Sequence, residues 1–327
     1  MMLDEKILNV LRNNTQTHVS SDELCKLADI SRAAIWKHIE KLRDEGYDIE
    51  ASPHLGYRLI SVPDRLIPGE IKWKLNTKIL GKEVISYNKV DSTNDIAYEL
   101  AEKGMKEGCV ILAEEQAKGK GRHGRNWASP PRGGVYLSCI LRPVMAPNEI
   151  PRITLLAAVA VARAVREVTG LAAMIKWPND IMVNGRKVCG ILTEMKAEQD
   201  KVDFLVLGIG INVNTPDRSL PKGASSLKAE LRREGRRPGD LARLEIAKAI
   251  LEYLERDYAV LKREGFKAII EEWKRLSSML GVRVKVVLQN RTFEGLTHDI
   301  DENGSLIVRL DSGVFERVSS GDVTLIR

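Results

Sequence analysis

The sequence has few cysteines and no long apolar run, and both shortages narrow the kinds of protein it can encode. Its four cysteines, at positions 25, 109, 139 and 189, are widely separated and form no Cys-x-x-Cys pair. That spacing indicates neither a disulfide framework nor a zinc site, so we expect reduced thiols in the cytoplasm. The longest apolar stretch, around residues 153–161, is too short to span a membrane, and no signal peptide is recognisable. We therefore expect a cytoplasmic protein with no membrane partner.

Length and charge set broader limits. A chain of 327 residues is too long for one typical hydrophobic core, which predicts two or three domains. With 43% hydrophobic and 29% charged residues, the composition is that of an ordinary soluble protein. The formal net charge of +6 permits a polyanionic partner without requiring one.

A glycine-rich loop at residues 119–127, Gly-Lys-Gly-Arg-His-Gly-Arg-Asn-Trp, carries the strongest functional signal. Its glycines fit Gly-x-Gly-x-x-Gly, the pattern of a dinucleotide-binding turn. The two prolines and two glycines of residues 128–134 prevent the helix that such a turn requires, and the loop lysine lacks the Ser or Thr of a Walker A motif. A basic surface loop would explain the charges but not the interleaved glycines. We therefore predict a cationic loop that wraps around a carboxylate and a phosphate.

The first 63 residues have the pattern of a winged helix-turn-helix. Ser31 is a good N-cap for a third helix, in which Ile35, Ile39 and Leu42 recur on one face and should point into the core. Two short strands then flank residues 52–55, a plausible wing.

The third helix is the predicted DNA-reading element. Its core-facing positions leave Arg32, Lys37, His38 and Lys41 to project outward. Residues 1–60, however, contain eight Lys or Arg and ten Asp or Glu, a net charge of −2, so any basic footprint is local. A helical protein-interaction domain with a solvated charged face is the alternative. One copy should bind DNA weakly, whereas two copies on a palindromic site would bind usefully.

The remaining chain is predicted to form a large central domain, residues 65–276, and a small β-rich tail, residues 279–327. Strand and helix patterns alternate in the central domain, which favours an α+β fold with a mixed, largely antiparallel sheet. Expected strands are 84–87, 110–113, 135–140, 173–177, 180–183, 189–195 and 204–211. Expected helices are 95–103, 153–169 and 242–276.

The loop resembles the ligand-binding loop of biotin–protein ligases, whose usual form is Gly-Arg-Gly-Arg-x-Gly-Arg-x-Trp. Every fixed position matches except Lys120, where the family usually has Arg. Other blocks agree in order and spacing: residues 91–94 (Asp-Ser-Thr-Asn), Gln116, residues 176–180 (Lys-Trp-Pro-Asn-Asp), Lys187 with residues 190–192, and residues 208–214. The winged-helix segment and the β-rich tail make the chain similar to the bifunctional form, a ligase that is also the biotin operon repressor.

The resemblance implies a fold for each part. It implies a winged helix-turn-helix over residues 1–63, a mixed-sheet ligase domain of the class II synthetase type over 65–276, and an SH3-like barrel over 279–327.

The resemblance also implies roles for individual residues. It places biotin against Ser92, Thr93, Asn94, Gln116, Lys120, Gly121, Arg122 and Lys187. It places ATP or the adenylate against Gly119, Arg125, Trp127, Asn179 and Asn212. Lys187, Arg122 and Asp180 are the candidate catalytic residues. Cations are required because joining an anionic carboxylate to an anionic phosphate develops further negative charge.

Ordinary structural roles remain open for several of these positions. Residues 92–93 precede a predicted helix and can simply cap it. Gln116 ends a strand and can be solvated, and Lys187 follows an Asn-Gly hairpin signal and can be an exposed hairpin lysine. Trp127 can pack the end of the loop into the core, and Asn179 can be a turn residue.

The resemblance implies a two-step reaction with ATP and Mg²⁺. Biotin would become biotinyl-5′-AMP, and its biotinyl group would pass to a lysine of the biotin carboxyl carrier domain of acetyl-CoA carboxylase. Mg²⁺ would sit mainly on the ATP phosphates, with Asp180 as a candidate ligand. The retained adenylate would favour a homodimer on operator DNA. A lipoate-type acyl ligase and a ligand-sensing repressor without catalysis are the rival hypotheses.

Overall fold

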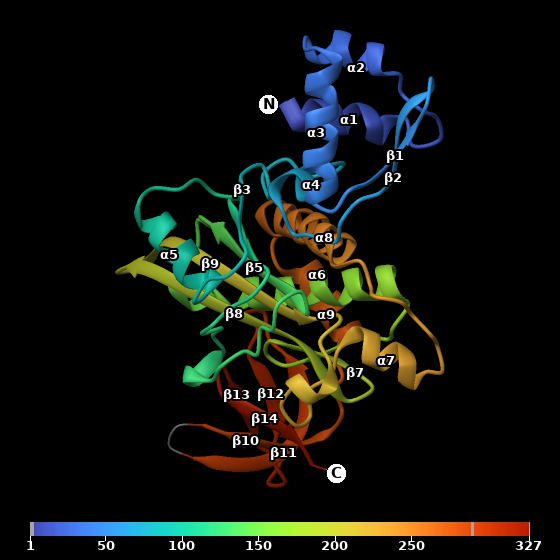
Figure 1. Ribbon diagram of the computed structural model, residues 1–327. Coiled ribbons are helices and arrows are strands. Elements are labelled where there is room, and N and C mark those ends of the chain that lie inside the picture. Colours follow the sequence, from blue (N-terminus) through green and yellow to red (C-terminus); the bar gives the residue numbers. More distant parts are fainter. Residues whose placement is uncertain (1–2, 289–290, 327) are drawn as a thin grey trace. The chain divides into compact units, whose positions relative to one another are not determined.

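The computed structural model describes residues 3–288 and 291–326, and the chain divides into two units, Met1–Arg65 and Leu66–Arg327 (Figure 1). Each unit has a hydrophobic core of its own. Among the described residues, no helix is long and apolar enough to cross a bilayer.

The first unit contains three helices followed by an antiparallel hairpin. The elements are α1 (Leu3–Asn13), α2 (Ser21–Ala28), α3 (Arg32–Asp44), β1 (Asp48–Ser52) and β2 (Gly56–Ser61). The Ser31 hydroxyl accepts a hydrogen bond from the Ala34 amide at 3.3 Å, as expected for the N-cap of α3. Ile35, Ile39 and Leu42 are fully buried. The helix-turn-helix prediction is therefore confirmed, and β1 and β2 flank the predicted wing.

A seven-stranded sheet forms the centre of the second unit. Its order is β3-β4-β5-β9-β8-β7-β6, and only β3 and β4 run parallel. The strands are β3 (Val84–Tyr87), β4 (Val110–Ala113), β5 (Gly134–Leu141), β6 (Met174–Lys176), β7 (Asp180–Val183), β8 (Arg186–Glu198) and β9 (Lys201–Asn212). The mixed, largely antiparallel sheet expected from the sequence is therefore present.

Helices cover both faces of this sheet. Apolar residues of α5 (Thr93–Glu102) pack with one set of alternating strand residues, which includes Ile111, Ile140 and Val206. The opposite set packs against α6 (Pro151–Thr169), α8 (Arg243–Glu264) and α9 (Lys267–Leu276). This unit also contains two short helices, α4 (Pro68–Lys72) and α7 (Leu227–Arg233).

The single helix expected over residues 242–276 is wrong in one respect. The chain breaks at Gly265, which has a φ of 78° and ends α8 before α9 begins at Lys267. With its ψ of −167° the Gly265 backbone leaves the helical path, and glycine adopts such a conformation without the strain of a side chain.

The C-terminal strands form a five-stranded antiparallel sheet in the order β13-β12-β11-β10-β14. They are β10 (Arg283–Val287), β11 (Thr292–Ile300), β12 (Leu306–Arg309), β13 (Phe315–Val318) and β14 (Asp322–Leu325). Between described residues the sheet is open, since its edge strands β13 and β14 do not pair. Its inward residues, such as Val284 and Leu306, join the core of the central sheet.

Candidate functional site

One cavity of about 510 Å³ lies on the central sheet, beside the glycine-rich loop. Thirteen of the fourteen predicted site residues of this unit line it: Ser92, Thr93, Asn94, Gln116, Lys120, Gly121, Arg122, Arg125, Trp127, Asn179, Asp180, Lys187 and Asn212. Gly119 lies outside the lining. Its role is to let the loop start close to its own end, since a Cβ there would lie 2.5 Å from the Trp127 carbonyl oxygen.

The α5 end of the cavity is a fixed hydrogen-bond network. The Thr93 amide and hydroxyl donate to Gln116 Oε1 at 2.8 and 3.1 Å, and Gln116 Nε2 donates to the Ser129 hydroxyl at 2.9 Å. Gln116 is therefore held in place rather than solvated. Ser92 occupies the N-cap position of α5, but its side chain makes no capping bond, so simple capping does not explain it.

Two strand residues complete this network, and the sequence pattern did not reveal them. The buried Ser138 hydroxyl on β5 lies 2.6 Å from Asn94 Oδ1 and 2.8 Å from Thr93 Oγ1. Asn94 Nδ2 donates to Glu194 Oε2 on β8 at 2.6 Å. Neither Ser138 nor Glu194 sits in a recognisable motif, because only strand pairing brings them to α5.

The glycine-rich loop folds back on itself. The Trp127 amide donates to the Gly119 carbonyl, and the Gly121 amide donates to the Arg125 carbonyl, each at 2.7 Å. Residues 122–124 form one 3₁₀ turn in which His123 has a φ of 55°. No α-helix follows, so the structure agrees with the rejection of a dinucleotide-binding turn.

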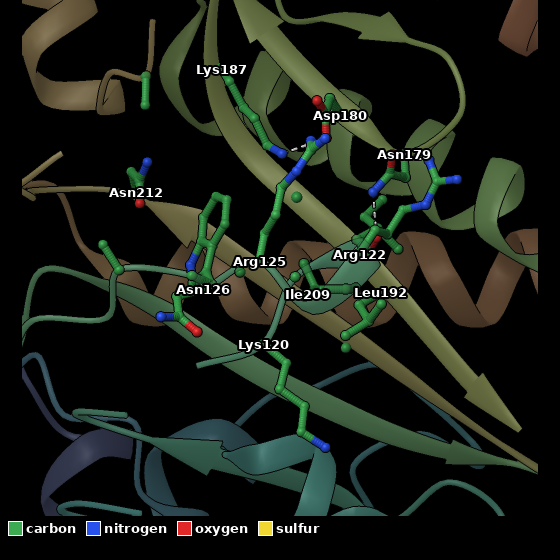
Figure 2. A pocket seen from close by; sticks show the side chains of 18 of the residues that line it. Lys120, Arg122, Arg125, Asn126, Asn179, Asp180, Lys187, Leu192, Ile209 and Asn212 are labelled. Atoms are coloured by element: carbon green, nitrogen blue, oxygen red, sulfur yellow. Dashed lines mark hydrogen bonds and ion pairs between the residues drawn. The ribbon is translucent and has the colours of Figure 1, made fainter. Parts of the chain in front are cut away.

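Each cation of the loop contacts a different element. Lys120 forms an ion pair with Asp95 of α5 and lies 3.6 Å from Glu194 of β8. Arg122 donates to Asn179 Oδ1 at 3.2 Å, between β6 and β7. The third cation, Arg125, pairs with Asp322 of β14. Figure 2 shows Lys120 pointing away from the other two cations.

Arg122 is the most enclosed of these three cations. Burial lowers the pKa of its guanidinium from the ordinary value, while Asp322 and Asp180 act in the opposite direction. The guanidinium remains protonated, because arginine does not lose its proton in proteins. A half-buried, permanent positive charge thus faces the cavity.

Lys187 and Asp180 form the ion pair at the centre of the cavity. Lys187 lies near the start of β8, and its Nζ is 2.6 Å from Asp180 Oδ1 of β7 (Figure 2). The same Nζ is 5.4 Å from the centre of the Trp127 ring. Asn184 and Gly185 have φ values of 49° and 73°, as expected for the predicted type I′ turn. Lys187 is therefore held over the cavity and is not a solvated hairpin residue.

At the far end of the cavity, two paired glycines form a flat surface, the shelf, on which the ring of Trp127 lies. Gly190 of β8 pairs with Gly210 of β9, and the Trp127 indole lies against both. A Cβ on Gly210 would lie 2.5 Å from Trp127 Nε1, and one on Gly190 would lie 3.0 Å from Cζ3. A side chain on Gly210 would therefore displace the indole, and one on Gly190 would crowd it.

Unpaired polar atoms mark the same end. Asn212 is 1% exposed, and its Nδ2 donates to the Ser225 carbonyl at 3.0 Å. Its Oδ1 and the Trp127 Nε1 are buried and have no hydrogen-bond partner among the described residues. Because an unpaired buried polar group is costly, these two atoms leave hydrogen-bonding capacity that a ligand in the cavity could use.

Comparisons with known proteins agree with this geometry. The sequence model of the Biotin/lipoate A/B protein ligase family matches residues 87–212, the "HTH domain" matches 4–58, and the "Biotin protein ligase C terminal domain" matches 279–325. The chain is 38% identical to the "Bifunctional ligase/repressor BirA" of Bacillus subtilis, over 94% of both chains. It belongs to the bifunctional biotin protein ligase family.

Other relatives of this ligase agree. The "Bifunctional ligase/repressor BirA" of Escherichia coli is 29% identical over 98% of this chain and 96% of its own. The structure of the Aquifex aeolicus biotin protein ligase in complex with biotin and ATP is 29% identical. It superposes with a TM-score of 0.63 over 75% of this chain and 99% of that one.

The residues predicted to read DNA differ in where the structure places them. Arg32 is exposed but pairs with Asp22 at 2.6 Å. His38 does not project outward as expected: its Nδ1 lies 2.6 Å from Asp4 of α1, and its side chain is only 28% exposed. Lys41 pairs with the same Asp4 at 2.6 Å. The fold of the unit explains the difference, because it brings Asp4, near the start of α1, within 2.6 Å of both side chains.

No cluster of three or more His, Cys, Asp or Glu side chains suited to a metal occurs in the described part of the ligase. Two carboxylates line the cavity: Asp180, beside Lys187, and Asp322, which pairs with Arg125. This arrangement fits a Mg²⁺ ion held mainly by substrate phosphates, which needs only one or two protein carboxylates.

Proposed function

We propose that this ligase joins biotin to ATP as biotinyl-5′-AMP and passes the biotinyl group to a lysine of the biotin carboxyl carrier domain of acetyl-CoA carboxylase. One observation carries the proposal: a single cavity combines three features. Its α5 end holds the hydrogen-bond network of Thr93 and Gln116, and its other end holds the unpaired Asn212 Oδ1 beside the Trp127 indole. Cations, Lys187 among them, lie between the two ends.

The α5 end suits the ureido group of biotin. Thr93, Asn94 and Gln116 line this end and offer several small donors and acceptors. The buried Ser138 hydroxyl contacts Thr93 and Asn94 from behind and fixes their positions. Leu137, Ile191, Leu192 and Ile209 supply apolar walls for the bicyclic ring. We assign Lys120 and Gly121 to the side of this pocket, where the loop covers it.

The opposite end suits adenine. The Asn212 amide is oriented by Ser225, so its free Oδ1 can only accept a hydrogen bond. Adenine offers a donor in its exocyclic amine, whereas guanine presents a carbonyl at that ring position. We propose that the Trp127 indole stacks on the base and that Arg125 and Asn179 contact the rest of the adenylate.

Lys187 and Arg122 stand where the two substrates meet. In the first step a biotin carboxylate oxygen attacks the α-phosphorus, and the bond to the β-phosphate breaks to release pyrophosphate. The two cations stabilise the charge that develops on the phosphoryl oxygens. Mg²⁺ on the phosphates would neutralise further charge. Asp180 orients the Lys187 ammonium through their 2.6 Å contact.

In the second step the carrier lysine amine attacks the acyl carbon of the adenylate. The bond between that carbon and the phosphate oxygen breaks, and AMP leaves with the electron pair. We propose that Asp180 accepts the proton of the attacking amine, since it is the carboxylate nearest Lys187 in the cavity.

Labelling of a carrier domain tests this function. The ligase, ATP, Mg²⁺ and a carrier domain are incubated with biotin or with lipoate, and intact mass is measured. Biotin should add one biotinyl group, and lipoate should add nothing. Transfer of lipoate instead would favour the rival acyl ligase, and transfer of neither would favour a repressor without catalysis. The Lys187–Asp180 pair facing the cavity argues against the latter.

We also propose that the adenylate-bound ligase is a homodimer that represses through operator DNA. The helix-turn-helix unit supports this, while its net charge of −2 makes two copies necessary for useful affinity. In mobility shifts, biotin and ATP together should strengthen binding. Removing residues 1–63 should abolish it and leave adenylate formation intact. Binding that is indifferent to ligands would leave a ligase with a DNA-binding appendage.

Finer features of the fold and its setting complete the proposal. We propose that the five C-terminal strands belong to an SH3-type barrel and that the central domain is of the class II synthetase type. We further propose a cytoplasmic location, where the acceptor enzyme and DNA are both accessible and where the buried thiols of Cys109, Cys139 and Cys189 remain reduced.

A further inference from the structure

Helix α3 carries less free positive charge than its sequence predicts. Three of its four cations lie in ion pairs 2.6 Å long: Arg32 with Asp22, Lys41 with Asp4, and Arg43 with Glu40. Among residues 3–65, Lys37 is the cation of α3 without an acidic partner. Phosphate contacts depend on available positive charge and carry no direct sequence information. The cations of α3 therefore account poorly for a sequence preference.

The same helix exposes a large apolar side chain. Trp36 is 55% exposed, although its neighbour Ile35 is fully buried in the domain core. Ala33, one turn earlier, is also exposed, so the indole and a methyl group share the solvent side of α3 with Lys37. Leu55, in the turn between β1 and β2, is 56% exposed as well. The two elements that a winged helix presents to DNA thus both carry apolar groups.

The chemistry of the major groove matches this surface. An α-helix fits the groove, and the thymine 5-methyl is the apolar group on its base edges. We propose that Trp36 contacts thymine methyl groups and so sets much of the DNA sequence preference of this ligase. Lys37 beside it holds a phosphate. The inference rests on the operator binding proposed above and adds the residue that discriminates between sequences.

Selection from a random-sequence DNA duplex library provides the first test. The full-length ligase with biotin, ATP and Mg²⁺ is compared with Trp36→Gln, Lys37→Gln and Leu27→Gln. Leu27 of α2 is the matched control, because it is also a large apolar side chain and its exposure, 54%, nearly equals the 55% of Trp36. Trp36→Gln should enrich a different or more degenerate sequence. Lys37→Gln should weaken all sequences alike and lower the salt slope by about one. Leu27→Gln should behave as the parent does.

Deoxyuridine substitution provides the second test. Each thymine of the enriched duplex is replaced in turn, which removes only its 5-methyl group. At the contacted position the parent should lose about fivefold or more in affinity, within the range of a single mismatched base pair. Trp36→Gln should bind both duplexes equally.

Three outcomes would overturn the inference. The first is that Trp36→Gln enriches the same sequence as the parent. The second is that both proteins respond equally to deoxyuridine. The third is that DNA selection is unchanged while transfer to the carrier domain falls, which would assign Trp36 to a protein partner. If the parent enriches no sequence, the operator-binding proposal itself fails, and that result is distinguishable from the first three.

Discussion

Replacing Lys187 by alanine removes the cation that we propose to lie where the two substrates meet. Its Nζ lies 2.6 Å from Asp180, so the change also leaves a carboxylate unpaired beside two anionic substrates. Loss of one preorganised electrostatic group typically lowers the rate by about 10²–10³, or about 2.7–4 kcal/mol. Two unit charges 4 Å apart repel by about 1 kcal/mol at the dielectric constant of water, so the exposed carboxylate brings the loss to the upper end of that range. We therefore expect a loss near 10³ in the adenylation rate.

Single-turnover release of pyrophosphate at saturating biotin and ATP measures that rate. The double variant Lys187→Ala, Asp180→Asn should recover about tenfold, equivalent to about 1.4 kcal/mol, because the unpaired charge is gone. Lys118→Ala is the matched control, since this exposed lysine pairs with Asp91 at 2.8 Å outside the cavity. The reasoning is refuted if Lys187→Ala keeps the parental rate, or if the second substitution deepens the loss.

Three further variants test other parts of the site. Arg122→Gly removes charge-assisted hydrogen bonds worth about 1.5–3 kcal/mol each, so bound adenylate should dissociate faster and label bystander lysines. An unchanged dissociation rate would show that Arg122 does not hold the adenylate. Lys120→Arg should change biotin affinity by less than about tenfold, because the substitution keeps the positive charge and the backbone amides of the glycine-rich loop also bind the ligand. A much larger gain in affinity, measured by calorimetry, would contradict this. Gly210→Ala should displace Trp127 and weaken ATP binding more than about tenfold, whereas Gly239→Ala, with nothing within 4 Å of its new Cβ, should not. Equal ATP affinity in the Gly210→Ala and Gly239→Ala variants would refute the proposal that the Gly190–Gly210 surface positions Trp127 for ATP.

Local patterns predicted most elements of the fold, because burial and helical or strand periodicity are properties of neighbouring residues. Ile35, Ile39 and Leu42 illustrate this, as does the Ser31 cap. The break at Gly265 was missed because apolar periodicity continues beyond it, although the glycine itself was visible. Closure of the C-terminal strands into a barrel depends on long-range pairing and stays a prediction.

The glycine-rich loop and the motif blocks indicated the site, yet their contacts could not be predicted. Arg125 meets Asp322 from almost 200 positions away, a contact that only the packed C-terminal sheet creates. Ser138 and Glu194 look like ordinary strand residues, and His38 looks like an outward-facing side chain until α1 brings Asp4 beside it. Such pairings arise from tertiary structure, for which a single sequence carries no local signal.

The central claim is that one cavity forms an adenylate and then discharges it to the carrier. The most direct measurement forms the bound product from biotin and ATP, removes all free nucleotide, and adds carrier domain without further ATP. We predict that each bound nucleotide yields one biotinylated carrier and one AMP, read by intact mass and by nucleotide chromatography. A transfer step that still requires ATP, or bound nucleotide that survives the chase unchanged, would contradict the account.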